Sequence, residues 1–317
     1  MKFKTTCLSA GLSLLLVLLF AGCQPAEESA VGNEPDAAQT PVVFTVNYPL
    51  AWIAERIGGS AIEVVFPAPA GVDPAHWQPD VETVLAYQGA DRVLLNGAGY
   101  AAWIRSASLS PGRLVDTSAQ LGKRLVPAGT VTHSHGPGGD HDHGDLASHT
   151  WLDPTLASAQ ADAVADSLTG LIPGRREENM RGKAGLASDL GVLDEALAKA
   201  FGGWREAGVL YSHPVYQYLD ARYALDGRSL VWEPGEDPGE SGWRELERLL
   251  AQRQATVMIW EDTPLATTAE TLQALGIQSV VFRTGAARPA DGDYLDLMND
   301  NLKRIAGARS GAVENAH

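Results

Sequence analysis

The stretch VVFTVNYPLAWIAERIGGSAIEVVF, residues 42–66, decides the fold class. Residues 42–46 are almost all apolar and predict a strand, and residues 61–66 predict another. Between them, apolar residues recur at helical spacing from Pro49 to Ile57, and Gly58-Gly59 closes the pattern, so a helix is predicted. Strands separated by a helix pair in parallel with a right-handed crossover, so this stretch predicts a βαβ unit.

The same alternation extends along most of the chain. Further strands are predicted at 92–95, 209–211, 229–232, 256–260 and 279–282, and further helices at 81–88, 156–171, 175–201, 214–223, 241–252, 267–275 and 294–306. The helix at 175–201 has leucines at helical spacing and is long for a small domain, which suits a rigid connection between two lobes. We therefore predict an α/β fold with two lobes, each a mostly parallel sheet flanked by helices, joined by one long helix.

The predicted boundaries follow from these patterns. They are a signal peptide at 1–22, a flexible tether at 23–40, an N-terminal lobe at 41–172 with a His-rich loop at 130–148, a linking helix at 173–203, a C-terminal lobe at 204–310 and a tail at 311–317. The His-rich loop is rich in Gly, His and Asp and lacks apolar periodicity, which predicts an exposed segment.

The N-terminus carries a secretion signal. Lys2 and Lys4 precede an apolar run, Leu8 to Phe20, that is too short to span a membrane comfortably and ends in Ala21-Gly22-Cys23. This order resembles a bacterial lipobox, in which Cys23 would be lipidated and become the first residue of the mature protein. The alternative is an ordinary signal with an incidental cysteine, but the polar, Pro-rich residues 24–39 are typical of a tether.

Composition restricts the chemistry. Cys7 lies in the signal, so lipidation of Cys23 would leave no thiol for metal binding or nucleophilic attack, and a metal site would use His and carboxylates. The formal charge of −15 becomes −17 when Lys2 and Lys4 are removed with the signal. Such an acidic surface disfavours nucleic-acid binding and attracts cations.

Three histidines stand singly, each at the edge of a predicted element: His76, His149 and His213. Any one of them alone would be interpreted as a structural or capping imidazole. Together, and spread over both predicted lobes, they indicate a shared site, because three imidazoles with a fourth oxygen ligand or water form a tetrahedral zinc set. His213 directly follows a predicted strand, the edge where α/β sheets gather their binding groups.

Four more histidines lie in the His-rich loop: His133, His135, His141 and His143. Histidines at alternate positions in a Gly-rich segment can chelate weakly and exchange quickly. We expect an auxiliary role in collecting or regulating metal. The alternative is a solvated polar loop.

These motifs, in this order, resemble the cluster A-I zinc/manganese substrate-binding proteins of bacterial ABC importers, zinc-type lipoproteins in particular. The resemblance rests on the lipobox, His76, Asn96-Gly97, the His-rich loop followed by His149-Thr150-Trp151-Leu152-Asp153-Pro154, the long helix, Ser212-His213-Pro214 and the closing segment 294–302. It implies one metal held in the cleft between the lobes, with His76, His149 and His213 as ligands, and delivery to a membrane permease.

The sequence departs from manganese-selective relatives at two positions. The third ligand there is usually Glu, whereas this chain has His213, and near an expected Asp it has Phe282-Arg283-Thr284-Gly285. Three nitrogen ligands favour Zn²⁺ over the harder Mn²⁺. The fourth ligand would be water, Glu261 or Asp262, although a helix N-terminal carboxylate is the preferred interpretation of Glu261.

The sequence therefore predicts a non-enzymatic, monomeric, membrane-anchored binding protein outside the cytoplasm, in the periplasm or on the cell surface, that carries Zn²⁺ to an ABC permease. Two alternatives stay open: a zinc hydrolase, since three histidines can also activate water, and an adhesin of the same fold. Against the hydrolase, the chain has no His-Glu-x-x-His motif.

Overall fold

The computed structural model describes residues 39–128, 133–134, 140–141 and 146–314, with the backbone alone for 133–134, 140–141 and 309–314. The signal peptide and most of the tether, including Cys23, lie outside the described residues, as do His135 and His143. Within the described residues, no helix combines the length and the apolar character that crossing a membrane requires.

The N-terminal lobe is built on a four-stranded parallel sheet in the order β2-β1-β3-β4. Its strands are β1 (Val42–Thr45), β2 (Glu63–Val65), β3 (Arg92–Leu95) and β4 (Leu114–Asp116). The α-helices of this lobe are α1 (Tyr48–Gly58), α2 (Val81–Gly89) and α3 (Pro154–Leu171). Each of these helices starts at a side-chain cap, since Asn47, Asp80 and Asp153 accept hydrogen bonds from backbone N–H groups of the first turn.

The C-terminal lobe repeats this plan with a parallel sheet in the order β10-β9-β7-β8. Its strands are β7 (Val209–Tyr211), β8 (Arg228–Ser229), β9 (Val257–Trp260) and β10 (Gln278–Val281). Its helices are α5 (Trp204–Ala207), α6 (Gln217–Tyr223), α7 (Gly239–Gln252), α8 (Ala266–Ala274) and α9 (Tyr294–Glu314). Strand β9 is buried along its whole length, as expected for a central parallel strand.

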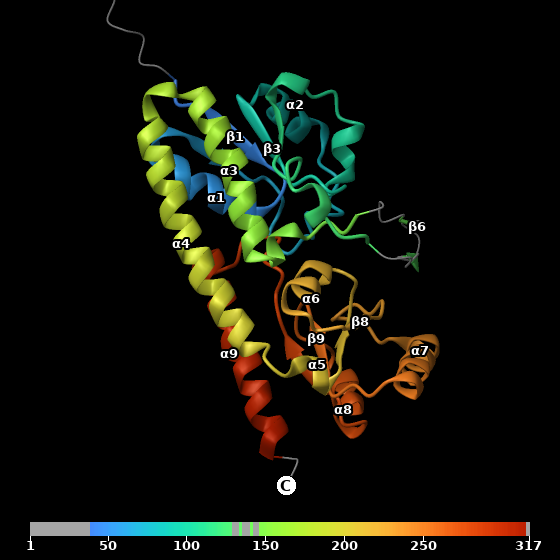
Figure 1. Cartoon of the computed structure of the whole chain (residues 1–317). Helices are drawn as coiled ribbons and strands as arrows, with labels where there is room; N and C mark the ends of the chain where they lie inside the picture. Colours follow the sequence, from blue (N-terminus) through green and yellow to red (C-terminus); the bar gives the residue numbers. More distant parts are fainter. Residues whose placement is uncertain (1–38, 129–132, 135–139, 142–145, 315–317) are drawn as a thin grey trace, which may run out of the picture. The chain divides into compact units, whose positions relative to one another are not determined.

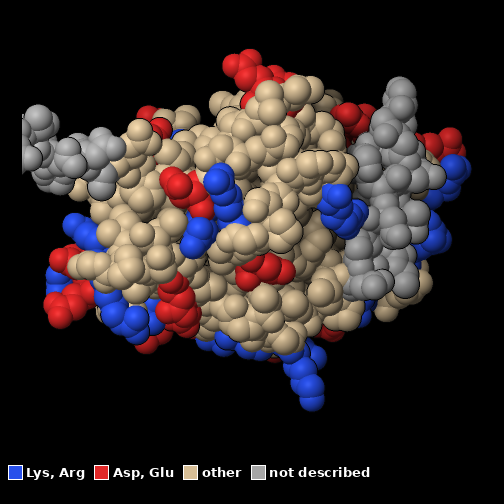
Figure 2. Space-filling view, turned by 90° about the horizontal axis from the view of Figure 1, so that it is seen from above, with Lys and Arg blue, Asp and Glu red and all other residues tan. Residues whose placement is uncertain are grey.

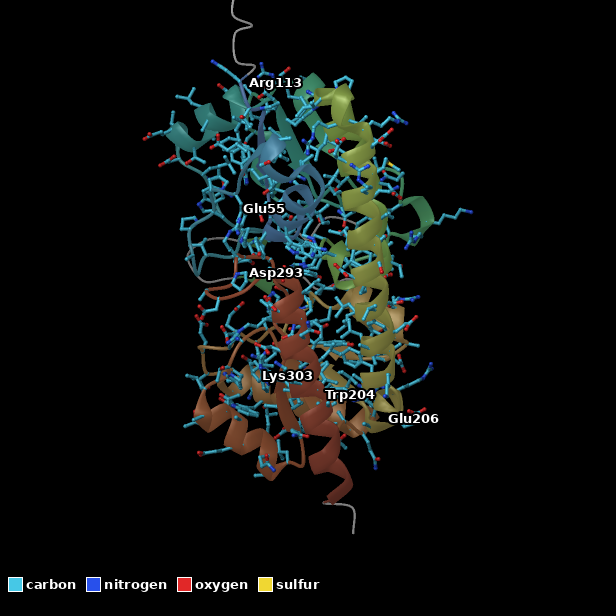
Figure 3. All side chains as sticks on the ribbon, turned by 90° about the vertical axis from the view of Figure 1, so that its left-hand side faces the viewer. Glu55, Arg113, Trp204, Glu206, Asp293 and Lys303 are labelled. Carbon is cyan, nitrogen blue, oxygen red and sulfur yellow. The ribbon has the colours of Figure 1, made fainter. Side chains whose placement is uncertain are left out.

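The long helix α4 (Arg176–Ala200) connects the lobes (Figure 1). Its buried residues include the leucines at helical spacing: Leu186, Leu190, Leu193 and Leu197. It packs against α1 and α3 of the N-terminal lobe and against α9, which lies beside it in Figure 3. The predicted fold class is thus confirmed, whereas the predicted domain boundaries stay predictions.

A second segment ties the lobes together. After β10, residues 283–293 run back to the N-terminal lobe, and we call them the return segment. The Tyr48 amide donates to the Ala286 carbonyl at 2.9 Å, and Trp52 Nε1 donates to the Asp293 carboxylate at 3.0 Å. Arg288 pairs with Glu55 at 2.7 Å, and Figure 3 labels Glu55 and Asp293 in this region. The lobes are therefore joined by α4 and by the return segment.

Several local predictions were wrong. Strand β4 was not predicted, the helix expected at 214–223 begins only at Gln217, and the strand expected at 229–232 is the short β8. The predicted His-rich loop is not wholly irregular, because the backbone of β5 (His133–Ser134) pairs antiparallel with that of β6 (Asp140–His141). On the face seen in Figure 2, basic and acidic side chains are interspersed and do not form a patch of one sign.

Candidate metal centre

Three ionisable side chains lie beyond the carboxyl ends of neighbouring C-terminal strands. His213 lies two residues after β7, Glu233 lies beyond β8 and Glu261 directly follows β9. The backbone fixes this edge, because the Ser212 amide donates to the Ile259 carbonyl at 2.9 Å and the Trp232 amide to the Ser212 carbonyl at 2.7 Å. Parallel pairing brings these carboxyl ends to one edge of the sheet, where α/β folds bind ligands.

In the N-terminal lobe, a buried polar network holds the residues on both sides of His149. Asn96, which follows β3, donates to the Ser148 carbonyl at 2.7 Å and accepts from the Thr150 hydroxyl at 3.0 Å. Asn96 is 1% exposed, so these bonds satisfy groups that would otherwise be buried without partners. The network also includes Asn47, Thr117 and Gln160. Its effect is to fix the backbone that carries His149.

The glycine after Asn96 has a steric role. Gly97 has φ +76°, and a Cβ atom there would lie 2.1 Å from Asp116 Oδ1 and 1.9 Å from Ser118 Oγ. Only glycine suits both the positive φ and this close approach. The Asn96-Gly97 pair therefore joins the polar network to a tight turn.

His76 lies in the connection between β2 and α2 and is less constrained. Asp73 accepts a hydrogen bond from the Ala75 amide at 2.9 Å, and its carbonyl accepts from the amides of His76 and Trp77. The His76 Nε2 atom lies 3.9 Å from Asp73 Oδ2, and the His76 side chain is 43% exposed. This turn presents an imidazole and a carboxylate together. The His76 side chain is more exposed than those of His149 and His213.

All three predicted histidine ligands line one cavity of about 1160 Å³, which residues of both lobes enclose. The carboxylates of Asp73, Glu233 and Glu261 line the same cavity. His149 and His213 are both only 6% exposed, although each borders the cavity. The cavity therefore carries nitrogen and oxygen donors from both lobes.

Neighbouring groups orient two of the imidazoles. Glu233 Oε1 lies 3.5 Å from His213 Nδ1, and the Ser148 hydroxyl lies 3.3 Å from His149 Nδ1. The His149 ring also contacts the rings of Tyr100 and Trp151, with centroids 5.9 and 4.8 Å away. Such contacts restrict the orientation of each ring, and an Nδ1 atom that donates to its oxygen partner leaves Nε2 as the donor toward a metal.

Glu261 lies where the ionised form of its carboxyl is disfavoured. Burial, followed by the nearby charges of Asp73 and Glu233, raises the pKa of Glu261 to about 8. Burial also raises the pKa of Tyr100, with further contributions from Asp73 and Glu261. The cavity lining includes carboxylates from both lobes, which is consistent with these contributions. A cation would relieve their repulsion.

The two carboxylates considered for the fourth ligand have different surroundings. Asp262 accepts hydrogen bonds from the Thr263 amide at 2.8 Å and from Arg283 Nη2 at 2.9 Å, and its side chain is 61% exposed. Glu261 lies in the cavity and is not at a helix N-terminus, because α8 begins only at Ala266 after its cap residue Leu265. The helix-terminus interpretation of Glu261 was therefore wrong.

The donor chemistry suits a metal of the zinc class, but the side chains are not gathered around one point. Among the described residues, no three His, Cys, Asp or Glu side chains lie close enough together to hold an ion as they stand. The set His76, His149 and His213 accordingly stays a prediction. The sequence patterns had not indicated Glu233 or Asp73, because a single acidic residue beside a turn carries no periodic signal.

The chain is similar to several known proteins. The profile of a family described as zinc-uptake complex component A, periplasmic, matches residues 43–308. The zinc-binding lipoprotein AdcA of Streptococcus pneumoniae serotype 4 is 23% identical over 291 residues, which are 87% of this chain but 57% of that relative's length. The manganese ABC transporter substrate-binding lipoprotein PsaA of S. pneumoniae is 23% identical over 93% of this chain and 96% of its own length.

A solved structure has the same fold. The Zn(II)-bound ZnuA-like domain of S. pneumoniae AdcA superposes with a TM-score of 0.69 at 20% identity, over 84% of this chain and 98% of that domain. At this identity the likeness establishes the fold alone.

Proposed function

The chain belongs to the family described as zinc-uptake complex component A, periplasmic, and on that premise we propose that it captures Zn²⁺ between its lobes and delivers the ion to a membrane ABC permease. The observation that carries the proposal is that His76, His149, His213 and Glu261 line one and the same cavity. Zinc is the cargo, so the chain needs no chemistry beyond binding and release.

The ligand set that we propose is His76, His149 and His213. His149 comes from the N-terminal lobe on a backbone fixed by Asn96, and His213 comes from the C-terminal sheet edge. The Ser148 and Glu233 contacts support Nε2 coordination by these two imidazoles. Three nitrogens leave one position of a tetrahedral zinc site open.

For the fourth position we propose Glu261. Both Glu261 and Asp262 border the cavity, but the Asp262 carboxylate is occupied by Arg283 and the Thr263 amide. A zinc ion would favour the ionised form of Glu261 and offset the repulsion among the cavity carboxylates. Water completes the site if Glu261 stays protonated.

Binding requires a local rearrangement, because the described donors do not converge as they stand. We assign most of the movement to His76, whose side chain is 43% exposed and lies in a turn. The buried His149 and His213 would form the preorganised part of the site. Such an arrangement lets an ion enter from solvent, meet two fixed imidazoles and be enclosed by the third.

The preferred metal follows from the donors. Imidazole nitrogen suits Zn²⁺, whereas Mn²⁺ is bound more often by oxygen. In this chain the third donor is His213, and Arg283 and Thr284 occupy the positions near which manganese-selective relatives carry an Asp. Both changes remove oxygen donors, which supports zinc over manganese.

Localisation is part of the proposal. We propose that Cys23 is lipidated and that residues 23–40 tether the folded part to the outer face of a membrane, so that a permease in a membrane can receive the ion. The four histidines of the segment 130–148 would collect metal as an auxiliary site. A monomer suffices for this role.

Calorimetric titration tests the metal assignment. The mature chain should bind one Zn²⁺ tightly, and Mn²⁺ added to the zinc-loaded protein should not displace it at equal concentration, because the site offers three nitrogen donors. Metal-free protein, prepared with a chelator and dialysed, is the starting material. Tight binding of Mn²⁺ with weak binding of Zn²⁺ would refute the assignment.

A further inference from the structure

Helix α6 of the C-terminal lobe lies against the N-terminal lobe. It begins at Gln217, four residues after His213, and packs against the short helix Thr150–Leu152 that follows His149. Gln217 Nε2 donates to the Ala128 carbonyl at 3.3 Å, and the Tyr218 hydroxyl donates to the Ala147 carbonyl at 2.9 Å. This helix is therefore a joint between the lobes, in addition to α4 and the return segment.

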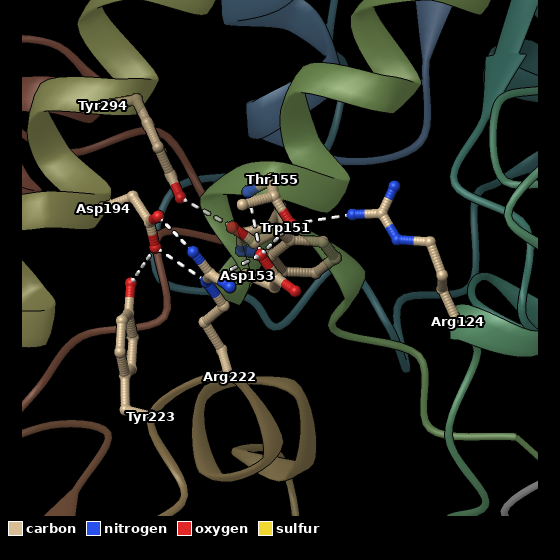
Figure 4. Close-up of polar contacts among 8 residues, drawn as sticks. All are labelled: Arg124, Trp151, Asp153, Thr155, Asp194, Arg222, Tyr223 and Tyr294. Atoms are coloured by element: carbon tan, nitrogen blue, oxygen red, sulfur yellow. Dashed lines mark hydrogen bonds and ion pairs between the residues drawn. The ribbon is translucent and has the colours of Figure 1, made fainter.

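One charged side chain at the end of α6 bridges two acids that belong to other elements. Arg222 donates from Nε to Asp194 Oδ1 at 2.8 Å and from its Nη2 to the second Asp194 oxygen. Its Nε atom also lies 3.8 Å from Asp153 Oδ1. Figure 4 shows Arg222 between these two carboxylates, with the Tyr223 hydroxyl donating to Asp194 from the other side at 3.0 Å.

The position of each acid matters. Asp194 belongs to the linking helix α4, and Asp153 caps α3 of the N-terminal lobe, where it accepts from the Thr155 amide at 2.8 Å. Both acidic side chains are well shielded, with 15% and 14% exposed, so solvent screens the ion pairs less than it screens ordinary surface pairs. The two-pronged bond from a guanidinium to a carboxylate also fixes geometry, which a single contact does not.

The two predicted buried ligands stand close to this cluster in the chain. His149 precedes Asp153 by four residues, and His213 precedes Arg222 by nine, with α6 between. A displacement of α6 against Asp153 would therefore change the separation of the two imidazoles.

We propose that Arg222, Asp194 and Asp153 form an interlobe clasp, in which Arg222 is a positioning residue that sets the spacing between His149 and His213 and thereby slows the release of bound metal. The proposal rests on the proposed function. Its physical basis is preorganisation: donors that are already held at the right spacing lose less freedom when they bind an ion, and so hold it longer.

A matched ion pair on the same helix provides the control. Arg56 of α1 pairs with Asp189 of α4, and both belong to the contact between α4 and the N-terminal lobe. The two arginines have similar exposure, 35% and 37%. Removing Arg56 therefore deletes an arginine–aspartate pair on α4, together with a contact to the Trp52 ring at 5.4 Å, without touching the joint at α6.

The first experiment compares zinc release from the full chain and its variants. Zinc-loaded wild type, Arg222→Met and Arg56→Met are mixed with excess fluorescent chelator, and the dissociation rate and melting temperature are measured. We expect release from Arg222→Met to be about tenfold faster, in the range seen when a group that orients a metal ligand is lost. Release from Arg56→Met should match wild type even if both variants melt earlier. Arg222→Lys should fall between wild type and Arg222→Met, because lysine keeps the charge but not the fork.

A second measurement needs no metal and keeps the two proposals separable. Cys7 and Cys23 are replaced by serine, spin labels are attached through Glu82→Cys in α2 and Glu247→Cys in α7, both exposed, and the interlobe distance distribution is recorded. We expect Arg222→Met to broaden the distribution and Arg56→Met to leave it unchanged. If wild type bound no zinc tightly but the broadening appeared, the proposed function would fail and the clasp would stand.

Either of two results would overturn the clasp. The first is an unchanged distance distribution in Arg222→Met. The second is a zinc release rate in Arg222→Met equal to that of wild type, provided that wild type binds zinc tightly. A variant that does not fold is replaced by Arg222→Lys, for which the same two readouts apply.

Discussion

The His213→Ala variant is expected to lose tight zinc binding while keeping its fold. His213 is 6% exposed and lies two residues after β7, so its loss removes one of the three proposed nitrogen donors. Losing a group that only orients a metal ligand costs about 10- to 100-fold in affinity, so losing the ligand itself should cost more than about 100-fold.

The measurement is a competition titration against a zinc chelator of known affinity, with wild type and variant side by side. Tyr211→Phe is the control, because Tyr211 lies two residues before His213. The substitution removes a buried hydroxyl that donates to Asp220 at 2.8 Å but leaves every proposed metal ligand in place. We expect Tyr211→Phe to be less stable yet to bind zinc like wild type. Equal zinc affinity in wild type and His213→Ala would remove His213 from the site.

Glu261→Gln is expected to raise the stability of the metal-free protein at alkaline pH and to lower its affinity for zinc. In the metal-free protein, burial and the charges of Asp73 and Glu233 raise the pKa of Glu261 from 4.5 to about 8. Between these two values the folded chain holds a proton that the unfolded chain has released, so the folded state loses stability as pH rises from about 4.5 to about 8. Above pH 8 both states are ionised and this loss is complete.

Glutamine cannot ionise, so this pH dependence should disappear in the variant. A shift of this size corresponds to a loss on the order of 5 kcal/mol in wild type, reduced to the extent that water reaches the side chain. Urea unfolding of metal-free protein at pH 5 and pH 9 measures it. We expect Glu261→Gln to resemble wild type at pH 5 and to be more stable at pH 9.

The zinc affinity of wild type should rise with pH, whereas the stability of its metal-free form falls. Wild type must release the Glu261 proton to offer an oxygen donor, so its affinity should rise with pH up to about 8, and this rise should be shallower in Glu261→Gln. At pH 8 the variant should also bind zinc more weakly than wild type. A variant with unchanged affinity and an unchanged pH slope would leave water as the fourth ligand.

The sequence predicted the fold well where burial is continuous. Strands β3 and β7 begin and end where predicted, because each is a short apolar run bounded by turn residues. Strand β4 was missed because Leu114–Asp116 ends in an exposed aspartate, has no fully buried residue and is defined by its pairing with β3. Such a strand depends on tertiary contact and leaves little pattern in its own residues.

The candidate site was predictable in part. The histidines could be found by residue type and by their positions at element edges, and the structure brings all three to one cavity. The role of Asn96 could not be predicted, because its partners Ser148 and Thr150 are distant in sequence and the network is visible only after folding. The same holds for Arg222, whose partners lie on two other helices.

Glu261 illustrates how local chemistry misled the prediction. A carboxylate shortly before a helical pattern is typical of a helix N-terminus, but Pro264 intervenes and α8 starts at Ala266. The residue is left at the end of β9, where the sheet turns it toward the cavity lining. The strand end was therefore a better guide to its role than the helix that follows.

The central claim, that both lobes hold one zinc ion through His76, His149 and His213, is tested most directly by anomalous diffraction at the zinc edge from crystals of the zinc-loaded chain. The predicted result is one strong peak in the cavity, with a nitrogen of each histidine at about 2.0–2.1 Å and an oxygen of Glu261 or a water as the fourth ligand. A principal peak outside the cavity, or one bound by only a single member of this histidine set, would contradict the claim.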